Sequence, residues 1–79
     1  MQETPSESTF IQALAKRVRE LREQSGLSSA EVARRMLMDR GNYTRIETGK
    51  TNPTSLTLFK LSQILNCTVA DFFENSSGK

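Results

Sequence analysis

Apolar residues recur at three- and four-residue steps along most of the chain, which is the period of an amphipathic α-helix. The clearest run has apolar residues at Phe10, Ile11, Leu14, Val18 and Leu21, with charged residues between them. A glycine at position 26 is the expected stop of this helix. No stretch shows the two-residue alternation of a half-buried strand. The pattern therefore predicts an all-α fold.

Start signals mark four further helices. Ser28 and Glu31 have the spacing of a reciprocal capping box for a second helix, and Asp39 can cap a third. Thr54 can cap a fourth helix, and Thr68 begins a weak signal for a short fifth. The inward positions of the second, third and fourth helices are Val32, Ala33 and Met36; Tyr43 and Ile46; and Leu58, Leu61, Ile64 and Leu65. We therefore predict a compact five-helix bundle.

Length allows one domain, because a chain of 79 residues cannot divide its core. Residues 9–74 carry the helical pattern and form the predicted domain. Residues 1–8 are polar and lack an apolar period, so they are predicted to be a flexible arm, and residues 75–79 a disordered tail. No run has the length of a membrane span or the form of a secretory signal, which favours a cytoplasmic protein without a membrane partner.

The residue inventory excludes several kinds of chemistry. Histidine is absent, and Cys67 is the single cysteine. Imidazole catalysis, a Cys/His zinc site and an internal disulfide are therefore excluded. The carboxylates are dispersed, and a hydroxyl nucleophile would have no histidine base. We expect no metal, no cofactor and no small-molecule substrate, and we predict that the protein is not an enzyme.

Positive charge is concentrated in the middle of the chain. The net charge of +2 does not by itself indicate a nucleic-acid partner. Residues 34–50, however, contain five Lys or Arg against two Asp or Glu. If Tyr43 and Ile46 point inward, then Arg40, Thr44 and Arg45 lie on the outward side of the third helix. Two short helices joined by three residues, with a polar outward face on the second of them, are typical of a helix-turn-helix. On this pattern alone, however, an ordinary solvated helix surface explains the arginines equally well.

Several short motifs occur in a fixed order. They are Val18-Arg19-Glu20-Leu21-Arg22-Glu23, Gly26-Leu27-Ser28, Val32-Ala33, Ile46-Glu47-Thr48-Gly49-Lys50 with Asn52-Pro53, and Leu58 to Leu65 with Asp71-Phe72. Together they resemble the lambdoid-repressor-like helix-turn-helix domains, also called the Xre or Cro/C1 family. The resemblance covers residues 10–73. It implies a second helix at residues 29–36 and a recognition helix at residues 40–47.

The resemblance also implies roles for residues at matching positions. Expected base contacts are Arg40, Gly41, Asn42, Thr44 and Arg45, and expected phosphate contacts are Ser28, Ser29, Arg35, Lys50 and Asn52. Arg22 and Glu47 match a partly buried ion pair between the first helix and the end of the recognition helix. The two arginines of the recognition helix are the best candidates for guanine, because a guanidinium can bridge O6 and N7. Leu37 departs from the family, which often has glycine in the turn.

Three apolar side chains, Leu56, Phe59 and Phe73, exceed what the predicted core needs, and we predict that they form a homodimer interface. Their alternative role is to close the base of a monomer's core. The resemblance thus implies sequence-specific binding of double-stranded DNA by a transcriptional regulator, a repressor that acts as a dimer on a palindromic operator. The alternative function is a protein-interaction or antitoxin-type module on the same fold, which the low net charge favours and the polar face of the third helix disfavours.

Overall fold

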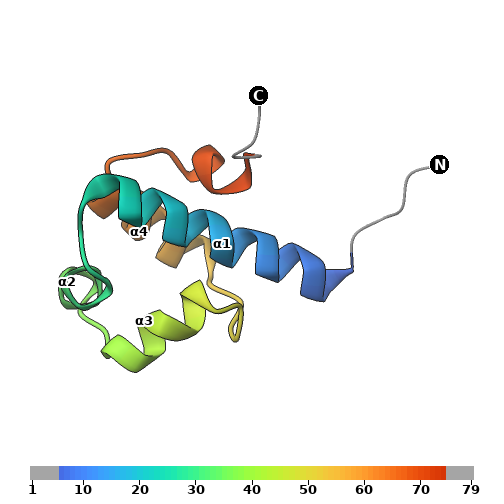
Figure 1. Ribbon diagram of the computed structural model, residues 1–79, viewed down its shortest axis with the longest axis horizontal. Coiled ribbons are helices and arrows are strands. Elements are labelled where there is room, and N and C mark those ends of the chain that lie inside the picture. Colours follow the sequence, from blue (N-terminus) through green and yellow to red (C-terminus); the bar gives the residue numbers. More distant parts are fainter. Residues whose placement is uncertain (1–5, 75–79) are drawn as a thin grey trace.

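The computed structural model describes residues 6–74, and their regular structure is entirely helical (Figure 1). The elements are α1 (Glu7–Ser25), α2 (Ser29–Met36), α3 (Arg40–Glu47), α4 (Ser55–Leu65) and the 3₁₀ helix η1 (Val69–Phe73). The all-α prediction is confirmed for this part of the chain. The prediction of five α-helices is wrong for the fifth. The five-residue η1 is too short for a regular series of α-helical hydrogen bonds and forms a 3₁₀ helix instead.

The first helix begins earlier than its apolar pattern indicated. Ser6 caps α1 by accepting a hydrogen bond from the Thr9 amide at 3.0 Å, and Glu7 is the first helical residue. The helix therefore includes the last two residues of the predicted arm. The remainder of that arm, residues 1–5, and the predicted tail, residues 75–79, lie outside the described residues.

Two of the four predicted caps differ from expectation. The Ser28 hydroxyl accepts from the Glu31 amide at 3.0 Å, but the Glu31 carboxylate is held by two arginines of α2, so the predicted reciprocal box is wrong. Asp39 precedes α3 without making a side-chain cap bond. The reciprocal box occurs at η1, where Thr68 and Asp71 each bond the other's amide.

Helices α2 and α3 are joined by residues 37–39, as the pattern predicted. Leu37 ends α2 in the left-handed conformation, with φ of 59°, and its amide bonds back into the last turn. This is the backbone region that favours glycine, and a leucine there costs about 1 kcal/mol. The Leu37 side chain is 93% exposed, so no packing within the described residues offsets that cost.

The core lies where α1 meets the other helices. In Figure 1 α1 crosses the middle of the molecule, with α3 and η1 on opposite sides of it and α4 behind. The buried apolar residues are Leu14, Val18, Val32, Ala33, Tyr43, Ile46, Leu58, Leu61, Leu65 and Phe72. Phe10, expected on the inward side of α1, is instead half exposed and stacks on Phe73 with 5.9 Å between ring centroids. Within the described residues, no helix combines the length and apolar character of a transmembrane span.

Candidate nucleic-acid interface

Helix α3 has one anchored face and one open face. Tyr43, Ile46 and Glu47 are buried against the core. The opposite side of the helix holds five exposed residues, and these are the predicted base contacts Arg40, Gly41, Asn42, Thr44 and Arg45. The fold therefore brings all five together on one solvent-facing surface of an eight-residue helix.

The anchored face contains a charged network. Arg22 Nε donates to Glu47 Oε2 at 2.6 Å, and Arg22 Nη2 donates to Oε1 at 3.1 Å, so the guanidinium binds the carboxylate through two hydrogen bonds. The third guanidinium nitrogen donates to the Leu27 carbonyl at 3.0 Å. The side chains of Arg22 and Glu47 are only 14% and 8% exposed. The ion pair implied by the family resemblance therefore exists and ties α1 to the end of α3.

The phenol of Tyr43 completes this network by donating to Glu47 Oε2. Burial and this hydrogen bond to a carboxylate raise the pKa of Tyr43 well above its usual value. The hydrogen bond with Glu47 also raises the pKa of the Arg22 guanidinium. Sequence reasoning placed Tyr43 in the core but missed its bond to Glu47, although the four-residue spacing of the two on one helix face was a usable signal.

The loop after α3 is fixed from both sides. Gln12 Nε2 reaches the carbonyls of Thr48 and Gly49 at 3.4 and 3.5 Å. Gly49 has φ of 73°, as expected for a helix stop, and any Cβ at this position would collide with the Gln12 amide. Arg45 Nη2 donates to the Lys50 carbonyl at 3.2 Å. Gln12 was not among the predicted functional residues, because a single glutamine on an amphipathic helix has no motif to mark it.

A hollow of about 270 Å³ lies between α3, the loop and the start of α4. Asn42, Arg45 and Asn52 all line it. Lys50, on the same loop, is exposed. The structure thus brings two of the predicted phosphate contacts, Lys50 and Asn52, next to the open face of α3.

The other predicted phosphate contacts lie on α2. Ser28 and Ser29 stand at the start of that helix, where free amides and the helix dipole suit an anion. Arg35, in contrast, donates to Glu31 at 2.6 Å and lines a separate hollow beside Ile64 and Cys67. The structure does not bring Arg35 to the open face of α3.

The three residues predicted for the dimer interface are all exposed. Leu56 and Phe59, on α4, are 60% and 53% exposed, and Phe73 is 50% exposed despite its stacking partner. The core of residues 6–74 therefore does not absorb these three side chains. Each of the three keeps half or more of its surface open to solvent.

Comparison with known proteins agrees with this geometry. A helix-turn-helix family model matches residues 18–72, and the chain therefore belongs to the helix-turn-helix family of Xre or Cro/C1 type. No curated protein sequence matches the chain significantly.

Several solved structures share the fold of this chain. The restriction-modification controller protein C.AhdI from Aeromonas hydrophila is 28% identical, with a TM-score of 0.75 over 80% of this chain and 96% of its own. The clp gene regulator ClgR from Corynebacterium glutamicum is 25% identical, with a TM-score of 0.80 over 86% and 72%. A hypothetical transcription factor, NHTF from Neisseria, is 23% identical and shares the fold, with a TM-score of 0.79 over 98% and 88%.

Proposed function

We propose that the protein is a sequence-specific regulator of transcription that represses by binding double-stranded DNA in the cytoplasm. The observation that carries this proposal is the open face of α3, whose exposed residues are polar or small and include two arginines. Such a face suits a major groove about 12 Å wide, where a guanidinium bridges guanine O6 and N7. Membership of the helix-turn-helix family and the similarity to the controller protein C.AhdI and the gene regulator ClgR support the same function.

The active form in this proposal is a homodimer on a palindromic operator. One recognition helix reads only about four or five base pairs, which is too few to define a unique site in a genome. The half-exposed Leu56, Phe59 and Phe73 supply an apolar surface for two-fold pairing. Two recognition helices about 34 Å apart would then read half-sites separated by roughly one turn of DNA.

Selection from random duplex DNA, followed by sequencing, tests the function. We expect a palindrome with two half-sites centred about 10 base pairs apart. If no sequence is enriched and the protein does not bind duplex DNA at low salt, the proposed function is contradicted. That result would favour the protein-interaction module instead.

Two substitutions then separate base contacts from phosphate contacts. Arg45→Ala should cost about 1 to 3 kcal/mol and relax preference at one base pair per half-site, because Arg45 lies on the open face of α3. Lys50→Ala should weaken binding to all duplexes and reduce the salt slope by about one. Gel shifts on selected and scrambled duplexes at two salt concentrations make the distinction, and equal losses on both duplexes would remove Arg45 from the base-reading set.

Phe59→Glu tests the dimer. The variant should stay helical, because Phe59 is half exposed, yet it should become monomeric and lose cooperative operator binding. Sedimentation of the unaltered protein provides the reference. A protein that sediments as a monomer at tens of micromolar, with and without operator, contradicts the dimeric form.

A further inference from the structure

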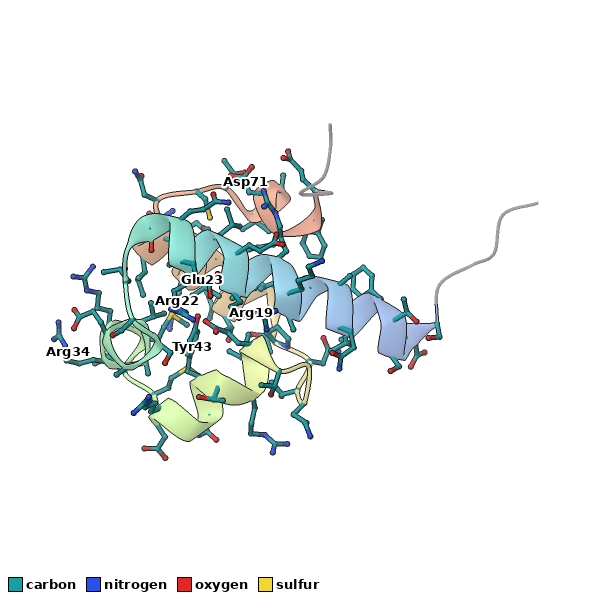
Figure 2. All side chains as sticks on the ribbon, in the orientation of Figure 1. Arg19, Arg22, Glu23, Arg34, Tyr43 and Asp71 are labelled. Carbon is teal, nitrogen blue, oxygen red and sulfur yellow. The ribbon has the colours of Figure 1, made fainter. Side chains whose placement is uncertain are left out.

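The side of α1 that faces α3 carries more than the two contacts already described. Gln12 reaches the carbonyls that end α3, and Arg22 grips Glu47. Arg19 comes seven residues after Gln12 and three before Arg22, so at about 100° per residue it lies on the same side of α1. Figure 2 places Arg19 on the edge of α1 that is turned toward α3.

Arg19 is exposed, and no carboxylate of residues 6–74 forms a salt bridge with it. Four other arginines, Arg17, Arg22, Arg34 and Arg35, each pair with a carboxylate at 3.5 Å or less. Within residues 6–74, neither an ion pair nor a hydrogen bond involves Arg19, and Glu23, one turn further along the same side, does not approach it as a salt bridge. The cation therefore stands free beside α3.

The position suits a phosphate better than a base. The axes of two packed helices lie about 8 to 10 Å apart, which exceeds half of the roughly 12 Å width of the major groove that α3 would occupy. A side chain on α1 therefore stands over the rim of that groove, where the sugar-phosphate backbone runs. On the other side of α3, Asn42, Arg45 and Asn52 line the hollow beside α4.

We propose that Arg19 binds a backbone phosphate of the DNA strand on the α1 side of the groove. The interface then extends from the helix-turn-helix onto α1, and contacts on both sides hold α3 in the groove. This inference rests on the proposed function. Because a phosphate contact carries no sequence information, it also predicts that Arg19 adds affinity without adding specificity.

Binding of Arg19→Gln to a random-sequence duplex, measured across salt concentrations, tests the inference without knowledge of the operator. Loss of one phosphate contact should reduce the slope of log affinity against log salt by about 0.9 and weaken binding about eightfold near 0.1 M salt. Arg19→Lys keeps the charge and should retain the slope. Lys16→Gln is the matched control, because it removes an equal charge from an exposed position of α1 beside Phe10 and Phe73.

The outcomes separate the two proposals. A reduced slope for Arg19→Gln, with unchanged slopes for Arg19→Lys and Lys16→Gln, supports the phosphate contact. Unchanged binding by Arg19→Gln, or equal losses in Arg19→Gln and Lys16→Gln, overturns it while the DNA-binding function stands. A loss confined to the selected operator overturns it as well, because that would indicate a base contact. Absence of duplex binding by the unaltered protein overturns both proposals.

Discussion

Glu47 and Glu31 both accept hydrogen bonds from arginines, and they do so in opposite settings. Glu47 lies at the junction of α1 and α3, where Arg22 and Tyr43 enclose it. Glu31 lies on the surface of α2, where it accepts from Arg34 at 2.5 Å and from Arg35 at 2.6 Å. The bond lengths are similar, but the Glu47 side chain is 8% exposed and the Glu31 side chain 28%.

Burial, rather than bond geometry, decides how much each of these ion pairs contributes to the stability of the fold. When a buried ion pair loses one member, the remaining charge is left uncompensated in the low-dielectric interior. When an exposed pair loses one member, water solvates the remaining charge. The buried pair also joins residues 25 positions apart and so sets the position of α3 on α1. The exposed pairs join residues three and four positions apart within one helix.

The largest expected effect is that of Glu47→Ala. It strands the partly buried Arg22 and removes the acceptor of Tyr43, so the free energy of unfolding should fall by about 2 to 4 kcal/mol. Glu31→Ala is the matched control, because it makes the same chemical change at an exposed pair. Thermal unfolding followed by circular dichroism measures both variants, and a Glu47→Ala melting temperature within a degree of the control would erase the contrast between the two sites.

A smaller effect is expected from Tyr43→Phe. The ring stays in the core, and Arg22 still holds both oxygens of Glu47, so only one hydrogen bond to a charged group is lost. The free energy of unfolding should fall by about 1 kcal/mol. Urea unfolding measures it. A loss as large as that of Glu47→Ala would mean that the phenol, and not the guanidinium, compensates the buried carboxylate.

Sequence pattern predicts helices better than it predicts caps here. The apolar period located all four α-helices because it reflects the burial of a helix face, which the core enforces. At Ser28, the predicted hydrogen bond from the Glu31 amide to the serine hydroxyl is present, but the return bond from the Glu31 carboxylate is not. The carboxylate instead binds two arginines on the next turn, which offer a positive charge that a backbone amide lacks. Such competition between side chains depends on rotamers that the sequence does not specify.

The candidate site also has a part that the sequence predicts and a part that it does not. The exposed face of α3 follows from the helical period once Tyr43 and Ile46 are assigned inward. The separation of Arg35 from that face does not, because it depends on how α2 sits against the ends of α1 and α4. The contact of Gln12 with the loop after α3 joins residues 36 and 37 positions apart, and no local motif encodes such a contact.

The end of α2 should tolerate, and even gain from, substitution. Leu37 has a left-handed backbone and an exposed side chain, so Leu37→Asn should raise the free energy of unfolding by up to about 1 kcal/mol. Asn66, which ends α4 in the same conformation, provides the reverse test, and Asn66→Leu should destabilise by a similar amount. Differential scanning calorimetry measures both. Destabilisation by Leu37→Asn would show that the leucine side chain stabilises the turn.

The smallest expected effect concerns the Glu31 pairs and their dependence on pH. Hydrogen bonds from Arg34 and then Arg35 lower the pKa of Glu31 from 4.5 to about 2 in the folded chain. Because the folded value is the lower one, the stabilisation is complete above about pH 4.5 and is lost as the pH falls toward 2. Water and salt screen this exposed pair. The melting temperature of Glu31→Gln should therefore lie slightly below that of the unaltered protein at pH 7, and the gap should narrow at pH 3 and in 1 M salt. A gap that persists at both pH 3 and high salt would place Glu31 with Glu47 among the carboxylates on which the fold depends.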